Sequence, residues 1–530
     1  MGKRGFLYGT LILVGAGFIT KVLGFIYRIA LSRIIGDEGI GLFHMAFPIL
    51  IFTVVITTAG LPVAISKLVS EAEAKNEEHR IRSILIVAIM VVIFTSIFFT
   101  SLLLLCAPVI ANTLLTDERT VYSLMGIAPI IPVIAISSVF RGYFQGRQNM
   151  SPYAISTIIE QTVRIFTVLS LATYLLPYGI EFASAGAMIG MVIGELAGMS
   201  FLLFRFKKDP KRPILFKSTQ SSTQQRKPFF KQWSSAIQDL VRIALPVTAS
   251  RMVGSLSYAV EPIVVAQSLA IAGITTATST AMYGQLEGMA IPLIFFPAFI
   301  TYALAVSLVP AISEAAAQNN MRMVEHRLQQ AIRLAMIIGA PCAVLLFILA
   351  EPVSVLIYRE PDVARLMKII APFAVFLYLQ GPLTSVLQGL DQAKTAMRNS
   401  IFGAFIKTGL IFALASQPSL GIDGVAIAIN CGIIIVTALH FISILKTVPF
   451  TIQLMDWIKL LLAVAIVGIV AYQMYIRQGD SLLIHVILTI LVCMGTYGLC
   501  LLLLDLIHKD DVNRIPYVGK WIAKLLPPSK

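Results

Sequence analysis

The sequence predicts an all-α, polytopic membrane protein with about 14 transmembrane helices, arranged as two pseudo-symmetric lobes around a central cavity. Three observations predict this fold class: an apolar composition, membrane-length apolar runs and an internal repeat. Hydrophobic residues make up 57% of the 530 residues and charged residues 13%, whereas roughly a quarter of a soluble chain is charged. Apolar runs of about 18 residues or more recur along the whole chain, and a helix of that length crosses a bilayer.

The internal repeat has an offset of 247 residues. Ala64-Ile65-Ser66 and Glu78-His79-Arg80 return as Ala311-Ile312-Ser313 and Glu325-His326-Arg327. Further along, Ser138-Val139, Gly142, Gln145 and Met150 return as Ser385-Val386, Gly389, Gln392 and Met397. Chance similarity between apolar helices is the alternative, but the charged triplet lies outside the apolar segments. The repeat therefore predicts two bundles that face each other across a central site, as in many transporters.

The apolar runs predict fourteen spans, six in each repeat and a final pair. In chain order they are 6–31, 42–66, 83–112, 121–143, 153–176, 182–205, 236–262, 279–308, 329–352, 364–388, 397–417, 421–446, 454–476 and 481–507. Residues 1–205 then form an N-terminal lobe, 236–446 a C-terminal lobe, and 447–530 two extra helices with a tail. Residues 206–235 are rich in Lys and Arg, which predicts a basic cytoplasmic linker between the lobes.

Basic residues set the expected orientation. With the N-terminus in the cytoplasm, 28 Lys and Arg residues fall on the cytoplasmic side of the spans and 5 on the outer side. Cytoplasmic loops of membrane proteins carry such an excess. The sequence therefore predicts a multi-pass protein of the cytoplasmic membrane, surrounded by lipid, with both termini in the cytoplasm. The first apolar run is not followed by a small-residue cleavage site, so we expect it to stay on the protein.

Several cations lie inside the expected spans, where a charge costs about 2.5 to 3.5 kcal/mol on insertion scales. One interpretation is a water-filled central cavity with a cationic, substrate-binding lining of Lys21, Arg28, Arg251, Arg164 and Lys407. Arginine binds phosphate or carboxylate through a fork of donors, and lysine acts as a point charge. Such a lining predicts an anionic cargo, for example a pyrophosphate head group. Internal ion pairs that hold helices together are the alternative.

Spacing separates these two interpretations. Lys21 and Arg28 are two helical turns apart, share one helix face, and have no acid one turn away on the same helix. Glu160 and Arg164 are four residues apart and are placed to pair, so internal pairing is the stronger interpretation for these two. Lys407 is the repeat counterpart of Glu160, so opposite charges occupy matching places in the two halves.

A second group of polar residues predicts ion coupling or a polar gate: Glu160, Glu261, Gln285 and Glu287. The last three flank the outer connection between the seventh and eighth spans, and structural polar contacts are the alternative for all of them. We expect no metal site and no cofactor. The five cysteines lie in or beside apolar segments without a CxxC pair, which is typical of small packing residues.

The composition also excludes some functions. The net charge of +14 is spread over short gaps between apolar runs rather than over a basic patch with aromatic residues, so nucleic acid is not an expected partner. No phosphate-binding loop, HExxH motif or Ser/His/Asp spacing occurs, so we do not expect an enzyme. A membrane glycosyltransferase requires paired acids or a donor-binding loop, and the short outer loops offer only Asp37-Glu38 and Asp117-Glu118.

Several motifs together resemble a known family. The opening of the chain, Lys21-Val22-Leu23-Gly24-Phe25 with Arg28 and Arg33-Ile34-Ile35-Gly36, resembles the flippases of the multidrug/oligosaccharidyl-lipid/polysaccharide exporter superfamily. Three further motifs are similar to the sporulation branch of its polysaccharide transporters: Gly60-Leu61-Pro62-Val63-Ala64-Ile65-Ser66-Lys67, Arg141-Gly142-Tyr143-Phe144-Gln145-Gly146 with Gln148-Asn149-Met150, and Met282-Tyr283-Gly284-Gln285-Leu286. The resemblance covers nearly the whole chain.

The resemblance implies two lobes in a V shape, as in MATE- and MurJ-like transporters, that open alternately to either side. It implies a lipid-linked saccharide as cargo and, for the sporulation branch, a role in spore cortex peptidoglycan. The related lipid II flippases carry basic residues in the first, second and eighth spans. Lys21 matches the first of these, but Tyr27 occupies the next place with Arg28 one residue later, and Gln285 stands where the relatives have arginine.

Two other functions stay open. One is a cation-coupled exporter of drugs or polysaccharides with the same architecture, although a cationic cavity argues against cationic drugs. The other is a scaffold that recruits cell-wall synthesis proteins, in which case the charges inside the spans would serve no transport purpose. We favour a flippase that moves an undecaprenyl-pyrophosphate-linked peptidoglycan precursor from the inner to the outer leaflet.

Overall fold

The described part of the chain is helical. The computed structural model describes residues 3–58, 60–210, 213, 229–451, 454–477 and 481–506, and these residues contain no β-strand. The predicted all-α class is therefore confirmed. The predicted linker 206–235 lies largely outside the described residues, as does the tail after residue 506.

The chain forms two compact units. The first is Met1–Gly288 with Ala415–Ile422, and the second is Met289–Leu414 with Asp423–Lys530. These units differ from the lobes that the repeat predicts, because the two helical segments that open the second repeat pack with the first unit. The lobe boundaries at residues 205 and 236 follow the sequence repeat and stay a prediction.

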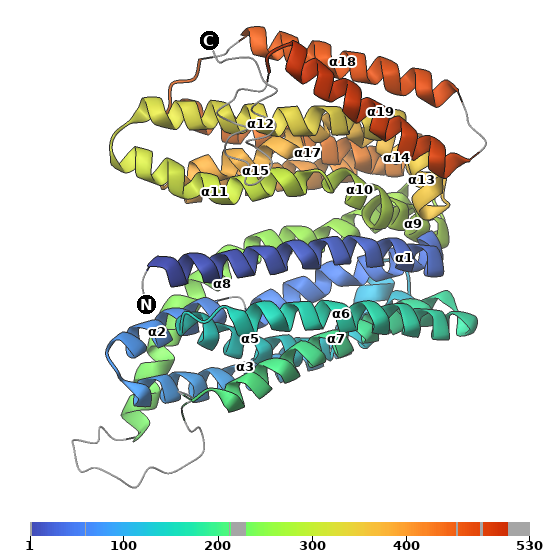
Figure 1. Cartoon of the computed structure of the whole chain (residues 1–530). Helices are drawn as coiled ribbons and strands as arrows, with labels where there is room; N and C mark the ends of the chain where they lie inside the picture. Colours follow the sequence, from blue (N-terminus) through green and yellow to red (C-terminus); the bar gives the residue numbers. More distant parts are fainter. Residues whose placement is uncertain are drawn as a thin grey trace. The chain divides into compact units, whose positions relative to one another are not determined.

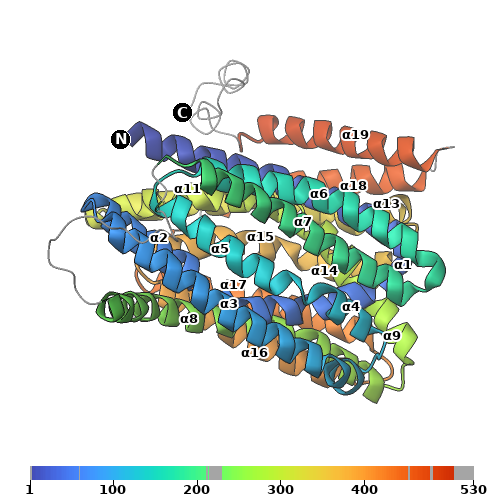
Figure 2. The same ribbon diagram turned by 90° about the horizontal axis from the view of Figure 1, so that it is seen from below.

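The helices of the first unit carry the polar clusters described below, and Figure 1 labels most of these helices. They are α1 (Lys3–Thr58), α2 (Leu61–Ala74), α3 (Glu78–Val109), the π-helix η1 (Ile110–Leu114), α4 (Thr120–Ile127), α5 (Ile130–Gly146), α6 (Ser151–Leu175), the 3₁₀ turn η2 (Leu176–Tyr178), α7 (Ile180–Lys208), α8 (Phe229–Ile271), α9 (Thr276–Tyr283) and the π-helix η3 (Gly284–Ala290), whose last two residues belong to the second unit. Within this unit α1, α6 and α7 lie side by side (Figure 2).

The second unit continues with shorter helices and ends in a helical pair. Its elements are α10 (Ile291–Phe295), α11 (Ala298–Ala317), α12 (Met321–Ile348), α13 (Ala350–Tyr358), α14 (Val363–Ile370), the 3₁₀ turn η4 (Ala371–Phe373), α15 (Ala374–Gly389), α16 (Ala393–Ala415), α17 (Ile422–Leu445), α18 (Leu454–Ile476) and α19 (Leu482–Leu503). The last two pack on each other as the predicted final pair (Figure 1).

Gly36 divides α1 into two helical halves. Its φ of 70° and ψ of −175° lie in a region that only glycine adopts without strain. Residues on the two sides of Gly36 match the first two expected spans, 6–31 and 42–66. Gly36 is therefore the connection between these two spans, although helical residues continue on both sides of it without a break.

The described residues contain 11 helical stretches long and apolar enough to cross a membrane. Gly15–Ala74 is one of these stretches and runs through Gly36, so it covers both the first and the second expected span. The eighth expected span is divided among α9, η3, α10 and α11, and the eleventh corresponds to α16, which carries three basic residues. The membrane-spanning fold is thus supported, and the count of fourteen stays a prediction.

The sequence repeat is visible in the packing. A Cβ atom on Gly142 of α5 would lie 3.1 Å from the Cβ of Ile65 on α2, and one on Gly389 of α15 would lie 2.7 Å from the Cβ of Ile312 on α11. Both pairs are related by the 247-residue offset. Each repeat therefore uses the same close approach of two helices, which a side chain larger than hydrogen would prevent.

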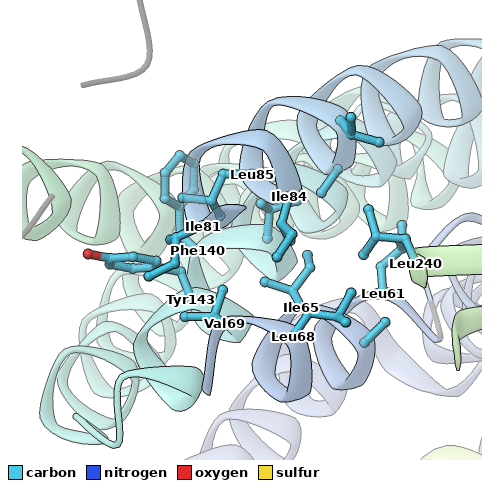
Figure 3. Packing of buried hydrophobic residues seen from close by; sticks show 14 of the residues in the cluster. Leu61, Ile65, Leu68, Val69, Ile81, Ile84, Leu85, Phe140, Tyr143 and Leu240 are labelled. Carbon is cyan, nitrogen blue, oxygen red and sulfur yellow. The ribbon is translucent and has the colours of Figure 1, made fainter. Parts of the chain in front are cut away.

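A hydrophobic cluster packs one end of the first unit. The distribution of basic residues predicts that this end faces the cytoplasm. Leu61, Ile65, Leu68 and Val69 of α2 pack against Ile81, Ile84 and Leu85 of α3, Phe140 and Tyr143 of α5, and Leu240 of α8 (Figure 3). Ile65 and Leu85 are fully buried, and burying such a side chain contributes about 1.5 to 3 kcal/mol relative to leaving it in water. The cluster joins α8 to the N-terminal helices, which helps explain why α8 belongs to the first unit.

Candidate functional site: three polar clusters in the first unit

The first polar cluster is a charge-balanced tetrad of Arg141, Glu160, Arg164 and Glu195 on α5, α6 and α7. Arg141 Nη2 lies 2.9 Å from Glu160 Oε2 and 2.8 Å from Glu195 Oε1. Arg164 Nη2 pairs with Glu160 Oε1 and lies 3.8 Å from Glu195 Oε2. Two cations and two carboxylates thus compensate each other. Arg164, expected from sequence to line a cationic cavity, has its guanidinium between carboxylates.

Two glycines of α7 make room for this tetrad. A Cβ on Gly194 would lie 2.7 Å from the Cβ of Arg164, and one on Gly198 would lie 3.0 Å from the Cβ of Glu160. The Glu160–Arg164 pair was predicted from spacing alone. Arg141 was missed as a partner because the sequence places it at the cytoplasmic end of its span, where a basic residue looks like a topology signal. The unpaired acid Glu195 in the next span was the available clue.

The second cluster, the inner polar layer, consists of Arg28, His44, Tyr258, Glu261, Tyr283 and Glu287. Arg28 and His44 lie on opposite sides of the Gly36 connection, each eight residues away, which is about 12 Å along a helix. Arg28 acts electrostatically on both His44 and Tyr258. Glu261 and Glu287 act in turn on Tyr258 and Tyr283. α1, α8 and α9 pack on one another, and a Cβ on Gly288 of η3 would lie 3.3 Å from His44 Cδ2, so the layer joins both halves of α1 with α8, α9 and η3.

Two irregular helical segments carry the acids of the inner polar layer. Glu261 precedes Pro262 inside α8, and proline cannot donate the backbone hydrogen bond to the carbonyl four residues earlier, which is that of Tyr258. Glu287 lies in the π-helix η3, a rare form that is common at functional sites. His44 and Glu261 are buried, with 5% and 6% of their surfaces exposed. A charge at this depth is costly and is expected to have a functional or pairing role.

The third cluster, the outer clasp, consists of Asp37, Glu38, Asp117, Arg119, Thr280 and Gln285. Arg119 Nη2 donates to Asp117 Oδ2 at 2.8 Å, and its Nη1 donates to Glu38 Oε1 at 2.7 Å. The Thr280 hydroxyl also donates to Asp117 Oδ2, at 2.7 Å. Burial alone would raise the pKa of the Asp117 carboxyl, but the hydrogen bonds from Arg119 and Thr280 outweigh burial and hold the pKa below its usual value.

The clasp also brings backbones unusually close together. A Cβ on Gly41 of α1 would lie 2.0 Å from the carbonyl oxygen of Thr280, and one on Gly284 would lie 2.0 Å from that of Asp37. Gln285 donates to Asp37 Oδ2 at 2.8 Å. Sequence reasoning grouped Gln285 with Glu261 and Glu287, whereas the structure places Gln285 in the clasp and the two glutamates in the inner polar layer.

Of the other predicted cations, Lys21 and Arg251 lie in the first unit and Lys407 lies in the second. Lys21 is exposed on the α1 face that also carries Gly24, where a Cβ would lie 3.6 Å from Gln161 Nε2 of α6. Arg251 is exposed on α8. Within the described part of the chain, neither Arg28 nor Arg251 makes a hydrogen bond or an ion pair with a carboxylate.

Lys407 belongs to the second unit and repeats the setting of Glu160. A Cβ on Gly432 of α17 would lie 3.0 Å from the Cβ of Lys407 on α16, just as Gly198 lies against Glu160 in the first unit. The described residues contain no group of three or more His, Cys, Asp or Glu side chains placed to hold a metal ion. His44, Glu261 and Glu287 therefore do not converge as metal ligands.

Comparison with known proteins identifies the family. A family model described as polysaccharide biosynthesis protein matches residues 6–316, more than half of the chain. The chain belongs to this polysaccharide biosynthesis protein family. A second model, MatE, matches residues 262–413. Among relatives of the family in Bacillus subtilis (strain 168), stage V sporulation protein B is 45% identical over 526 residues, which cover 99% of this chain and 100% of that protein.

More distant proteins are also similar to this chain. Lipid II flippase MurJ of Bacillus subtilis (strain 168) is 26% identical over 485 residues, 87% of each chain. A solved structure of lipid II flippase MurJ in an inward closed conformation has a TM-score of 0.68 at 16% identity, covering 92% of this chain and 98% of that one. An inward-facing multidrug resistance MATE family transporter has a TM-score of 0.64 at 15% identity, covering 80% and 93%. The chain is thus a multi-pass membrane protein of the predicted transporter fold, and the resemblance found in its motifs is confirmed.

Proposed function

We propose that the protein is a flippase that moves a lipid-linked saccharide with a pyrophosphate head group from the inner to the outer leaflet by alternating access. One observation carries the proposal. Arg28 lies in the inner polar layer within the spans, and no carboxylate forms an ion pair with it among the described residues. An arginine without a hydrogen-bonded carboxylate retains its fork of donors for a phosphate.

Arg251 extends the same reasoning, and Lys21 is a further candidate because it is an exposed cation inside an expected span. Both are exposed in the first unit, and a cation inside a span normally faces a hydrated cavity or an anion because hydrocarbon does not solvate it. The proposed phosphate contacts are therefore Arg28, Arg251 and Lys21. Arg164 was also predicted as a contact, but its pairing with Glu160 and Glu195 favours a structural role. Lys407 remains a proposed contact in the second unit.

The similarity to named relatives supports a more specific cargo. Stage V sporulation protein B and lipid II flippase MurJ are both relatives of this chain. We therefore propose undecaprenyl-pyrophosphate-linked peptidoglycan precursor as the cargo and spore cortex synthesis as its use. The 28 to 5 distribution of basic residues supports cytoplasmic termini. The MatE match over residues 262–413 and the two acids of the inner polar layer keep a cation-coupled polysaccharide exporter as the second candidate.

A leaflet-specific assay tests the proposal. Purified protein in vesicles would receive precursor in one leaflet, and an impermeant reagent would report its arrival in the other. We expect Arg28→Gln and Arg251→Gln to lower the rate about 10- to 100-fold, because each loses a charge-assisted hydrogen bond to phosphate. Arg242→Gln is the matched control, since Arg242 is an exposed arginine near the end of the same α8 span. Normal rates in both variants, with intact protein, would contradict the role of these cations.

A further inference from the structure

A buried amide on α6 lacks a hydrogen-bond acceptor where α6 packs against the first half of α1. Gln161 is 7% exposed, and within the described part of the chain no group accepts a hydrogen bond from its Nε2 atom. A buried donor left unsatisfied costs free energy and therefore calls for an explanation. An acceptor that arrives only with the cargo would supply one.

The orientation of this amide follows from its neighbour on the same helix. The Arg164 guanidinium donates through Nη1 to Gln161 Oε1 at 3.5 Å. Exchanging the oxygen and the nitrogen of the amide would place two donors against each other. The carbonyl oxygen is therefore the atom on the side of Arg164, and Nε2 is the atom that has no partner.

Gly24 of α1 lies beside this Nε2 atom. A Cβ on Gly24 would lie 3.6 Å from Nε2, and no other atom of a neighbouring helix, among the residues that the structure describes, lies within 4 Å of that Cβ position. Gly24 is itself partly exposed. The amide is thus covered at this point by a residue without a side chain, and the broad terminal torsion of glutamine allows Nε2 to turn toward the exposed side of Gly24.

The two cations of the first span lie on either side of Gly24 along α1. Lys21 precedes Gly24 by three residues and Arg28 follows it by four, so the three positions share one face of the helix. The seven residues from Lys21 to Arg28 correspond to about 10 Å along the helix axis. The Gln161 amide therefore lies opposite the middle of this stretch.

We infer that Gln161 is a further cargo ligand, whose Nε2 donates a hydrogen bond to a phosphate oxygen held between Lys21 and Arg28. This inference rests on the proposed function and adds a neutral donor to its cationic contacts. Arginine and lysine supply charge, whereas an amide supplies a directional hydrogen bond without changing the charge of the site. The unsatisfied donor gains its acceptor when the cargo binds.

Gln161→Leu tests the inference through two measurements on the purified protein in detergent micelles. One is the Kd of a short prenyl pyrophosphate linked to N-acetylglucosamine, measured by calorimetry, and the other is the unfolding midpoint in a denaturing detergent. We expect Kd to rise about 10- to 100-fold, because a hydrogen bond to a charged group is lost. The midpoint should be unchanged or higher, because an unsatisfied buried donor is removed.

Gly24→Ala tests the same contact without altering the amide. The added Cβ would lie 3.6 Å from Nε2, which is an ordinary van der Waals distance that the fold tolerates. The methyl group would nevertheless cover the amide on its exposed side. We therefore expect Kd to rise in this variant as well, with little change in the unfolding midpoint, so the inference stays testable if Gln161→Leu does not fold.

Gln267→Leu is the matched control, because this glutamine has acceptors within the protein. Gln267 Nε2 donates to the carbonyl oxygens of Thr113 and Leu114 at 2.6 and 3.2 Å. Its replacement should lower the unfolding midpoint and leave Kd unchanged. A second probe, the same prenyl pyrophosphate without the sugar, distinguishes a phosphate contact from a saccharide contact, and the effect of Gln161→Leu should persist with it.

The outcomes separate this inference from the proposed function. A wild-type Kd in Gln161→Leu or in Gly24→Ala overturns the inference, and so does a rise in Kd that is confined to the probe with the sugar. Each of these results leaves the flippase proposal intact. Absence of binding of both probes to the wild type instead contradicts the proposed function.

Discussion

Arg119→Gln tests whether the outer clasp contributes substantially to stability. Arg119 makes hydrogen bonds of 2.8 and 3.0 Å to the Asp117 carboxylate and one of 2.7 Å to Glu38. The Asp117 side chain is only 2% exposed, and that of Arg119 is 28% exposed. Removing one partner of a buried pair costs about 3 to 5 kcal/mol because it leaves a buried charge. We expect about 3 kcal/mol, the lower end of that range, because Arg119 is partly exposed.

The control is another Arg–Asp pair in which the arginine is exposed. Arg365 Nε lies 3.1 Å from Asp423 Oδ1, with side-chain exposures of 60% and 25%. Exposed pairs contribute about 0 to 1 kcal/mol, so Arg365→Gln should have little effect. Unfolding of both variants in detergent micelles, followed by circular dichroism against a denaturing detergent, measures the difference. Equal losses of stability in Arg119→Gln and Arg365→Gln would refute the argument from burial.

The pH dependence of the same pair has a defined sign. The pKa of Asp117 is lowered in the folded protein, so its stabilising contribution is present above the unfolded pKa of about 3.9 and is lost as the pH falls through the lower folded pKa. The difference in the free energy of unfolding between the wild type and Arg119→Gln should therefore be constant near neutral pH. It should become smaller below about pH 4. If this difference instead became smaller between pH 8 and 6, a group other than Asp117 would determine the pH dependence of the clasp's stability.

Two further substitutions test the close packing and the charge tetrad. Gly284→Ala should destabilise the protein by about 1 to 3 kcal/mol, because its Cβ would lie 2.0 Å from the Asp37 carbonyl oxygen; Gly409→Ala, with no atom within 4 Å, should be neutral or stabilising in the same unfolding assay. Glu195→Gln should cost about 3 kcal/mol, the lower end of the range for a buried pair, since it leaves two partly exposed guanidinium groups with one carboxylate. Replacing Arg141 by Met in the same chain should recover part of that loss, and a purely additive double variant would indicate that the two residues do not interact.

Sequence reasoning located helices and charges better than it located their partners. Composition and run length were sufficient for the helical class, and the spacing of Glu160 and Arg164 predicted a pair that forms. The role of Arg141 required knowledge of which helices are neighbours. Helices in a bilayer are apolar on most faces, so their periodicity carries little information about which face meets which helix.

Sequence reasoning also missed two local conformations. One is the connection at Gly36, and the other is the conformation that separates Gln285 from Glu287. Helical residues continue through Gly36, and the apolar pattern on either side does not show that this glycine has a φ of 70° and a ψ of −175°. Gln285 and Glu287 are two residues apart and therefore point to different sides of their segment. The π-helical conformation of η3, which places one in the clasp and the other in the inner polar layer, has no signature in the sequence.

The matched settings of Glu160 and Lys407 make the two halves of the chain electrically different at a shared position. Each lies against a glycine of the following helix, Gly198 or Gly432, yet the two side chains have opposite charge. A protein assembled from two copies of the first half would repeat the glutamate where the natural chain has a lysine. Neither half is therefore expected to substitute for the other in a homodimeric reconstruction.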